Sequence, residues 1–295
     1  MKRIHAYLLL MRPANIVTAI ADVLAGIAIS GILSMMTTTS APMEILLLCI
    51  STIGLYGGGI VFNDVFDYKI DMVERPERVI PSGKISIGEA TGLGIVLLLI
   101  GIIAALLVNT TAFVLAILTS IAALTYNRWG KHHSLLGPPN MGLCRGLNLL
   151  LGVSILPAMV FDLWYIAIVP IIYISAITMI SRGEVHGSSR KPLYSAALLY
   201  GLVILMILWF AWNQQKQLVA IPFLLGFAFM IYRPLLKAIQ LPTGPAIGKS
   251  VKAGVIALIL MNGAWAAAGG QWLLALVIVA LLPFSLWLSK IFAVT

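Results

Sequence analysis

The sequence is poor in charged residues. Asp, Glu, Lys and Arg make up only 10% of its 295 residues, whereas a soluble domain carries about 25%. Hydrophobic residues make up 61% of the chain, and no polar stretch is long enough to form a soluble domain. A soluble protein is therefore excluded, and we predict one integral membrane domain over residues 1–295.

Cysteine is also scarce, and the N-terminus lacks the features of a cleaved signal. The two cysteines, Cys49 and Cys144, lie far apart in different apolar segments, so neither a disulfide nor a metal motif is predicted. The basic start MKRIHAYLLLMRPAN has an apolar part too short for a signal-peptide core, and no small-residue cleavage site follows. We expect it to be retained at the membrane interface.

Apolar runs predict the topology. Ten of them are long enough to cross, or nearly cross, about 30 Å of hydrocarbon; nine is the alternative count, because the last two are short. If the N-terminus is cytoplasmic, every Lys and Arg except Lys216 lies on or flanks the cytoplasmic side, as the positive-inside rule requires. The runs are 16–35, 44–63, 90–108, 110–127, 140–160, 164–181, 193–212, 217–233, 252–268 and 272–290.

This charge asymmetry also bounds the function. It accounts for the net charge of +9 without a nucleic-acid partner. The longer loops, including the cap segments at about 64–89 and 182–192, fall on the cytoplasmic side, so we expect the active face and both termini there. A bacterial-type inner membrane is the expected location.

Three of the ten acidic residues lie in the stretch NDVFDYKID, residues 63–71. If the second span continues as a helix, Asn63, Asp64, Asp67 and Asp71 fall within one arc of about 100°. Like charges at this spacing destabilise a bare helix, and a hard cation such as Mg²⁺, which prefers oxygen ligands and bridges carboxylates to phosphates, reverses that effect. The alternative is a solvated helix end whose acids pair with Lys69, Arg75 and Arg78.

The loop that follows, RPERVIPSGKIS, fits a phosphate site. Arg75, Arg78 and Lys84 are placed to neutralise phosphate oxygens. Ser86 and Glu89 have the spacing of a capping box that starts the third span. The loop is therefore expected to combine anion binding with a defined helix start.

Polar residues inside the spans are further candidates, since they are costly in a membrane. Asn15 and Asp22 share a face of the first span, where Asn15 is expected at a diphosphate or acceptor. Asp22 is assigned either to an acceptor or to an interhelical hydrogen bond. Arg145, three residues before Asn148, is expected to pair with an aspartate of 63–71 or with a phosphate. Asn262 is assigned to helix packing.

These motifs resemble the UbiA superfamily of intramembrane prenyltransferases. The family's NDxxDxxxD motif is matched by Asn63, Asp64, Asp67 and Asp71. Arg12–Asn15 is similar to the family's RPxN entry to the first span, and residues 78–83 are similar to its RP…SG loop. Tyr126 with Lys131 resembles its Tyr…Lys pair, and residues 145–148 resemble its RGLN segment. Within the superfamily, CRGLN and SRGEVHG look most like the UbiA-like proteins called EboC.

The resemblance implies an all-helical fold around a central cavity capped on the cytoplasmic side. Mg²⁺ and a prenyl diphosphate would bind there, and the isoprenoid group would pass to an aromatic or hydroxylated acceptor, a small molecule or a lipid. The combined assignment is catalysis by Asp64, Asp67, Tyr126 and Lys131; substrate binding by Asn15, Arg78, Lys84, Arg145, Asn148 and Arg182; and metal binding by Asn63, Asp64, Asp67, Asp71 and Glu184.

The chain departs from the family at the second acidic motif. Relatives carry paired aspartates after the sixth span, whereas SRGEVHGSSRK has one carboxylate, Glu184, with His186 nearby. Arg182, Arg190 and Lys191 are placed to substitute fixed charge for a second cation. The alternatives are a non-catalytic lipid-binding protein or a transporter, although the acidic residues at the rim, rather than at mid-membrane, disfavour transport.

Overall fold

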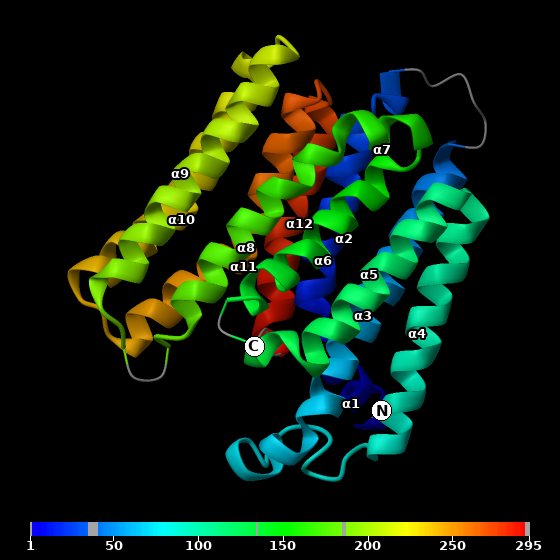
Figure 1. The fold of residues 1–295 in the computed structure, drawn as a ribbon, viewed down its shortest axis with the longest axis vertical. Coiled ribbons are helices and arrows are strands. Elements are labelled where there is room, and N and C mark those ends of the chain that lie inside the picture. Colours follow the sequence, from blue (N-terminus) through cyan, green and yellow to red (C-terminus); the bar gives the residue numbers. More distant parts are fainter. Residues whose placement is uncertain (1, 35–40, 134, 185–186, 293–295) are drawn as a thin grey trace.

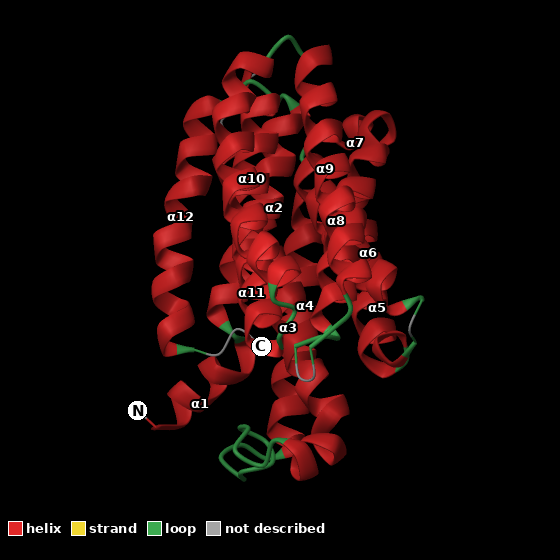
Figure 2. Ribbon diagram, turned by 90° about the vertical axis from the view of Figure 1, so that its left-hand side faces the viewer, coloured by secondary structure: helices red, strands yellow, loops and turns green. Residues whose placement is uncertain are grey.

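The computed structural model describes residues 2–34, 41–133, 135–184 and 187–292, and every regular element in these ranges is helical (Figure 2). The chain order is α1 (Lys2–Met11), α2 (Pro13–Ser30), the 3₁₀ helix η1 (Ile32–Ser34), α3 (Ala41–Glu74), α4 (Ile87–Val108), α5 (Thr110–Arg128), η2 (Gly130–His132), α6 (Gly137–Val153), α7 (Pro157–Leu163), η3 (Trp164–Ala167), α8 (Ile168–Ser181), α9 (Arg190–Asn213), α10 (Gln217–Gln240), α11 (Gly244–Ala268) and α12 (Trp272–Ile291).

The helices form a bundle with α2 and α11 at its centre (Figure 1). In each of these two helices, 78% of the most apolar 18-residue window is buried, against 28% in α10 and 22% in α12. The central helices are rich in alanine and glycine, whereas the peripheral ones present large apolar side chains such as Leu225, Phe229 and Trp287 outward. This is the arrangement expected when lipid, rather than water, surrounds the bundle.

Nine helical segments in the described ranges are long and apolar enough to cross a membrane. The predicted run 140–160 is the one that falls short, since it becomes α6, only 17 residues long, followed by the short α7. The last two runs, which we expected to be doubtful, form full-length α11 and α12. The membrane fold and the count of nine to ten spans are therefore confirmed, but the uncertain span is the fifth.

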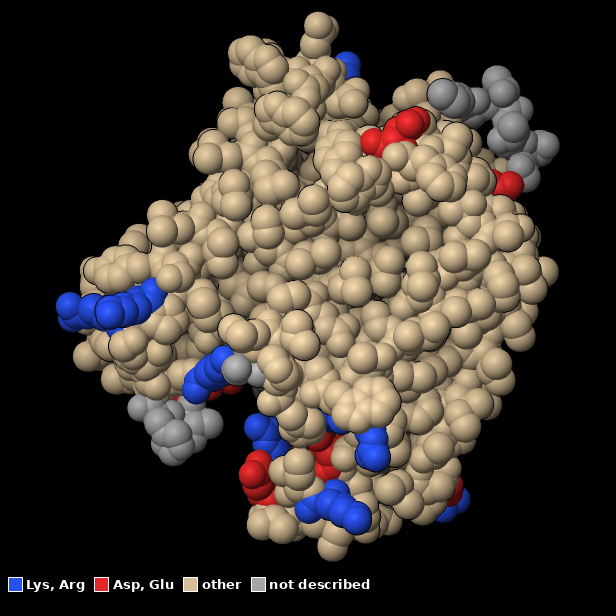
Figure 3. Space-filling model, in the orientation of Figure 1, with Lys and Arg blue, Asp and Glu red and all other residues tan. Residues whose placement is uncertain are grey.

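Both ends of the described chain lie on one side of the bundle. The ring of His5, in α1, lies 5.5 Å from the ring of Phe292, which follows α12. On the face seen in Figure 3, most Lys and Arg atoms lie in the lower half, below a broad zone without charged side chains. They extend from the lower ends of α9 and α10 at the left to the end that holds α1 and the loop after α3 (Figures 1 and 3). The predicted segregation of basic residues at one end is visible on this face.

The helix α3 extends well beyond a membrane's thickness. Its 34 residues span roughly 51 Å at about 1.5 Å per residue. The first part of the predicted cap segment 64–89 is therefore helical. Residues 64–74 belong to α3, and the connection begins only at Arg75. The predicted capping box is confirmed, since Ser86 and Glu89 exchange side chain–backbone hydrogen bonds at the start of α4.

Two glycines allow α2 and α6 to touch backbone to backbone. A Cβ added to Gly152 would lie 2.1 Å from the carbonyl oxygen of Val23, and one added to Gly26 would lie 2.2 Å from that of Leu149. Neither neighbour is a flexible side chain, so the helices themselves would have to separate. Small residues are the general means of such close approach between membrane helices.

We expect Gly152→Ala to lower the melting temperature of the detergent-solubilised protein, because α6 and α2 must separate to admit the methyl group. Gly226→Ala in α10 is the matched control, since a Cβ there meets nothing within 4 Å. Alanine is favoured over glycine inside a helix by about 1 kcal/mol, so the control should melt at the same temperature or higher. Equal melting of the two variants would contradict the close approach.

Candidate active site

A cavity of about 380 Å³ lies between α2, α3, α5, α6, α8 and α11. Much of its wall is apolar, with Leu55, Ile174 and Leu258 among the contributors. The polar and charged residues among its lining are Arg12, Asn15, Tyr56, Asn63, Thr119, Tyr126, Asn127, Arg145, Asn148, Thr178, Ser181 and Glu184. Six residues predicted for the site from sequence thus line one cavity: Asn15, Asn63, Tyr126, Arg145, Asn148 and Glu184.

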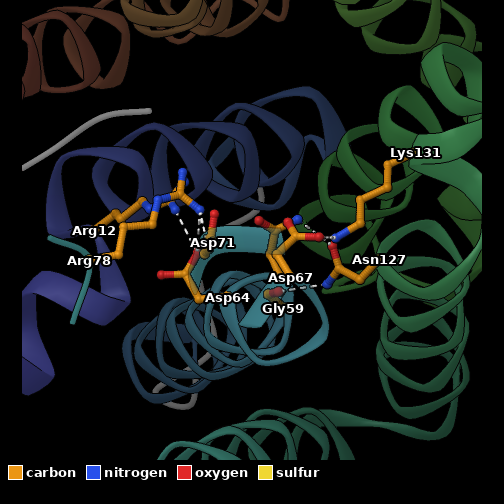
Figure 4. A network of polar contacts seen from close by, with 9 residues as sticks. Arg12, Gly59, Asp64, Asp67, Asp71, Arg78, Asn127 and Lys131 are labelled. Atoms are coloured by element: carbon orange, nitrogen blue, oxygen red, sulfur yellow. Dashed lines mark hydrogen bonds and ion pairs between the residues drawn. The ribbon is translucent and has the colours of Figure 1, made fainter. Parts of the chain in front are cut away.

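The acidic stretch lies on the last turns of α3, where two arginines bind it (Figure 4). Arg12 Nη2 donates to Asp64 Oδ1 at 2.7 Å, and Arg78 Nη1 donates to Asp71 Oδ2 at 2.7 Å while lying 3.7 Å from Asp64 Oδ1. Asp64 and Asp71 are buried. The mutual repulsion of the two carboxylates is therefore offset by cations from the α1–α2 junction and from the loop after α3.

Arg12 was not among the residues predicted for the site. It forms the break between α1 and α2, with a left-handed backbone (φ 48°) that costs a residue other than glycine about 1–3 kcal/mol. Pro13 starts α2 directly behind it, and the guanidinium reaches Asp64 across 52 positions of sequence. The Arg12–Pro13–x–Asn15 pattern was the available signal, but the turn that aims Arg12 at the acidic stretch is visible only in three dimensions.

Asp67 faces a different cation from its two neighbours. Lys131, in η2 after α5, forms a salt bridge with Asp67. One turn deeper, Asn63 Nδ2 donates to Asn127 Oδ1 at 3.0 Å, and Asn127 Nδ2 donates to the carbonyl oxygen of Gly59 at 2.7 Å. In Figure 4, Arg12 and Arg78 approach the acidic stretch from the left, whereas Lys131 and Asn127 approach it from the right. Asn127 was also missed from sequence.

The alternative interpretation of the acidic stretch, in which its acids pair with basic side chains, is partly confirmed, whereas metal binding stays a prediction. Its acids do pair with basic side chains, but of Lys69, Arg75 and Arg78 only Arg78 forms a salt bridge with them in the described residues, and Arg12 and Lys131 come from other elements. Two predicted substrate-binding residues, Lys84 in the loop after α3 and Arg182 at the end of α8, are exposed. Neither belongs to the lining of the cavity.

Glu184 represents the second acidic motif at the cavity. It lies in the connection after α8 and lines the same cavity as Asn63. Partial burial raises the pKa of its carboxyl group above the usual value, and the positive charge of Arg75 opposes that rise. The two cap connections, after α3 and after α8, therefore lie close enough to interact electrostatically. His186 lies outside the described residues.

A second polar cluster lies deeper, where Arg145 pairs with Asp22 rather than with an aspartate of residues 63–71. Arg145 Nη1 donates to Asp22 Oδ2 at 2.7 Å, and the side chains are 4% and 2% exposed. Asn148 Nδ2 donates to the same oxygen at 3.1 Å, and Asn262 Nδ2 donates to Asp22 Oδ1 at 2.6 Å. One expected partner for Arg145 is thus wrong, while Asp22 and Asn262 make the interhelical hydrogen bonds proposed for them.

The side chains at the mouth of the cavity offer the donor atoms that Mg²⁺ prefers, but they do not form a complete metal site by themselves. Asn63, Asp64, Asp67, Asp71 and Glu184 offer only oxygen, which is the donor that Mg²⁺ prefers. Among the described residues, however, no three His, Cys, Asp or Glu side chains gather closely enough to form a metal site by themselves. The residues therefore fit an ion that takes one or two carboxylates and completes its shell with phosphate oxygens and water.

Fold and site together define a helical membrane protein with an open-mouthed cavity, where acidic and basic side chains converge on one long helix. The chain belongs to the UbiA prenyltransferase family, whose model matches residues 23–241. The superfamily resemblance seen in the motifs is therefore confirmed. The EboC-type assignment within it stays a prediction.

Curated relatives of this chain include digeranylgeranylglyceryl phosphate synthases. It is 29% identical over 255 residues to the digeranylgeranylglyceryl phosphate synthase of Saccharolobus solfataricus, covering 81% of this chain and 84% of that protein. It is 33% identical over 149 residues to the synthase of Sulfurisphaera tokodaii, where the match spans about half of each, 50% of this chain and 52% of the relative. Both relatives carry the same name.

A solved UbiA homologue shares the fold. The structure from Archaeoglobus fulgidus bound to GPP and Mg²⁺ superposes with a TM-score of 0.61, covering 84% of this chain and 99% of that one. The sequences are 14% identical, so the likeness concerns the arrangement of helices.

Proposed function

We propose that this protein is an intramembrane prenyltransferase that transfers an isoprenoid group from a prenyl diphosphate to an acceptor, with Mg²⁺ as cofactor. The observation that carries the proposal is the mouth of the cavity, where Asn63 of α3 and Glu184 of the α8–α9 connection line one space and Asp64, Asp67 and Asp71 lie on the same helix end. Family membership and the GPP and Mg²⁺ held by the A. fulgidus homologue support it.

In this proposal the C–O bond between the prenyl carbon and the diphosphate breaks, and its electron pair leaves with the diphosphate. The acceptor then supplies the electron pair for the new bond to that carbon and loses a proton. Bound Mg²⁺ supplies charge stabilisation for the leaving diphosphate. The apolar walls of the cavity keep water from the allylic cation.

The residues at the mouth divide these tasks. Asp64 and Asp67, with Asn63, Asp71 and Glu184 around them, would hold Mg²⁺. Arg12, Arg78 and Lys131, which now neutralise the aspartates, would turn to the diphosphate oxygens when Mg²⁺ neutralises the carboxylates instead. Tyr126 and Asn15 line the cavity, where Tyr126 would face the allylic cation. Lys84 and Arg182 stay predicted substrate ligands, reached only if their connections close over the diphosphate.

The orientation follows from charge. Basic residues are concentrated at the end that carries the acidic stretch, and the positive-inside rule supports a cytoplasmic location for such an end. We therefore expect the mouth of the cavity and both termini to be cytoplasmic, in a bacterial-type inner membrane or its archaeal equivalent. Water-soluble diphosphate would then enter from the cytoplasm.

The incomplete second acidic motif supports one competing function, a lipid-binding protein that does not turn over prenyl diphosphate. Glu184 is the one acidic residue of the second motif that lines the cavity in the described part of the chain. If two metal ions are indispensable for ionisation, this mouth would bind a diphosphate and leave it intact. The competing function thus predicts binding with no release of diphosphate.

The experiment that decides is incubation of the purified protein in detergent with labelled geranyl and geranylgeranyl diphosphate, Mg²⁺ and a membrane extract. We expect Mg²⁺-dependent release of diphosphate and a labelled lipid product. Binding of the labelled diphosphate without release would favour the lipid-binding function. Neither binding nor release of any prenyl diphosphate would overturn the proposal.

A further inference from the structure

The inner part of the cavity carries a polar group that the transfer of a purely hydrocarbon chain does not need. Arg145 and Asn148 belong both to the lining of the cavity and to the cluster around Asp22. Each oxygen of the Asp22 carboxylate accepts hydrogen bonds, Oδ1 from Asn262 and Oδ2 from Arg145 and Asn148. The cluster is thus an interlocked unit made by α2, α6 and α11.

This unit is electrically neutral. The single positive charge of Arg145 faces the single negative charge of Asp22 at 2.7 Å. The other cation in the cavity lining, within the described residues, is Arg12, which is held by Asp64 at the mouth. An anionic group that entered the inner cavity would therefore meet no uncompensated cation and would lose its hydration.

Tyr56 gives the neutral unit a directed donor. Arg145 Nη2 donates to the hydroxyl oxygen of Tyr56 at 2.7 Å and to Thr18 Oγ1 at 2.6 Å, and the guanidinium stacks 4.4 Å from the centre of the Tyr56 ring. Because the Tyr56 oxygen already accepts a hydrogen bond, its own O–H proton is directed to another acceptor. Tyr56 lines the cavity, so a bound molecule can supply that acceptor.

The position of Tyr56 defines which part of a bound molecule it meets. Tyr56 precedes Asn63 by seven residues on α3, which places it on the same helical face, roughly 10 Å farther from the mouth. A group at Tyr56 is therefore remote from a diphosphate held near Asn63 and Asp67. An isoprenoid tail carries no oxygen at that distance and would leave the O–H without a partner, which is costly in a buried site.

We infer that the acceptor carries an uncharged hydroxyl or carbonyl oxygen at the end remote from its reacting atom, and that this oxygen accepts a hydrogen bond from Tyr56. This inference rests on the proposed function and makes it more specific. Tyr56 is a specificity-determining residue, Arg145 a residue that positions it, and Asp22 the residue that keeps the inner cavity neutral. An acceptor with a carboxylate at that end is excluded, because Asp22 already neutralises the charge of Arg145.

Three probes of one shape test the inference: 2-naphthylmethanol, 2-naphthoate and 2-methylnaphthalene. Their affinities are measured by fluorescence titration of the purified protein in detergent, loaded with Mg²⁺ and a non-ionising thiolo analogue of geranyl diphosphate. We expect the alcohol to bind about tenfold more tightly than the hydrocarbon, which is the gain from one net hydrogen bond in a buried site. The naphthoate should bind more weakly than the alcohol by at least the same factor.

Two tyrosine variants separate a specific contact from a general effect. Tyr56→Phe should lower the affinity for the alcohol to that for the hydrocarbon. Tyr232→Phe is the matched control, because its hydroxyl donates to the carbonyl oxygen of Ala197 and it does not belong to the cavity lining. We expect it to leave all three affinities unchanged. Equal behaviour of the two variants would overturn the inference, as would tighter binding of the naphthoate by the unmodified protein.

Charge variants test the neutrality directly. Asp22→Asn leaves Arg145 uncompensated and should raise the affinity for the naphthoate at least tenfold relative to the alcohol. The double variant Asp22→Asn/Arg145→Gln is neutral again, so it should bind the alcohol more tightly than the naphthoate. It tests the inference even if the single variant does not fold. A double variant that prefers the naphthoate would overturn the inference.

The binding of radiolabelled geranyl diphosphate with Mg²⁺, measured on the same samples without the thiolo analogue, keeps the two proposals apart. If that binding fails while the probes and variants behave as expected, the proposed function fails and the neutral inner site stands. If the diphosphate binds and turns over while the three probes bind alike, the inference about Tyr56 fails alone.

Discussion

Replacing Arg145 by alanine is expected to lower the free energy of unfolding by about 3–5 kcal/mol, the cost typical of breaking a buried ion pair from one side. Asp22 would lose its cationic partner at a site where its side chain is 2% exposed, and the amides of Asn148 and Asn262 would remain as its partners. The loss would also release Thr18 and Tyr56, to which Arg145 donates. Thermal or denaturant unfolding of the detergent-solubilised protein measures it.

The matched control is Arg3→Ala, which removes the same side chain from an exposed ion pair. Arg3 lies 3.3 Å from Glu89, and the two side chains are 78% and 37% exposed. Solvent screens an exposed pair, so its contribution to stability is small, and Arg3→Ala should unfold almost as the unmodified protein does. If the two variants lose similar stability, the Asp22–Arg145 pair does not hold the central helices together.

The neutral double variant Asp22→Asn/Arg145→Gln tests why Arg145→Ala loses stability. Two amides can hydrogen-bond without either leaving a buried charge, and neutral replacements of buried ion pairs are often nearly as stable as the original. We expect the double variant to recover most of the stability lost in Arg145→Ala. No recovery would show that the length and shape of the arginine side chain, rather than charge balance, sustain the packing of α2 against α6.

The parts of this molecule that the sequence predicts are those governed by local physics. Apolar runs predict the spans because bilayer thickness sets their length. The spacing of Ser86 and Glu89 predicts a capping box that both residues form within one helical turn. The i, i+4 spacings within residues 63–71 predict one polar face if the helix continues, and α3 does continue to Glu74.

The parts that the sequence does not predict are the long-range partners. Arg145 pairs with a residue 123 positions away, and the choice between Asp22 and an aspartate of residues 63–71 depends on how deeply α6 packs against α2. That depth is determined by the backbone contact at Gly26 and Gly152. Arg12 was missed because its partner depends on a left-handed turn, a conformation that residue type alone does not indicate.

Asparagine in place of Asp64 or of Asp67 is expected to reduce Mg²⁺-dependent turnover of geranyl diphosphate by at least about 1,000-fold, because charge stabilisation of a leaving group accounts for several kcal/mol of a barrier. Each substitution keeps the size and an oxygen of the side chain but removes its negative charge. It also leaves a cation without its partner, Arg12 in the first variant and Lys131 in the second. Release of labelled diphosphate, followed from the Mg²⁺ concentration that saturates the unmodified protein upward, is the measurement.

Glu74→Gln is the matched control, since Glu74 is an exposed acid at the end of the same helix and lies outside the cavity lining. It should turn over substrate at the unmodified rate. A rescue of Asp64→Asn by raised Mg²⁺ would indicate that the carboxylate recruits the ion, whereas loss at every Mg²⁺ concentration would indicate that it also holds Arg12 in position. Full turnover by both aspartate variants would exclude Asp64 and Asp67 from the chemistry, because the remaining carboxylates, Asp71 bound to Arg78 and Glu184 across the cavity, would then be sufficient.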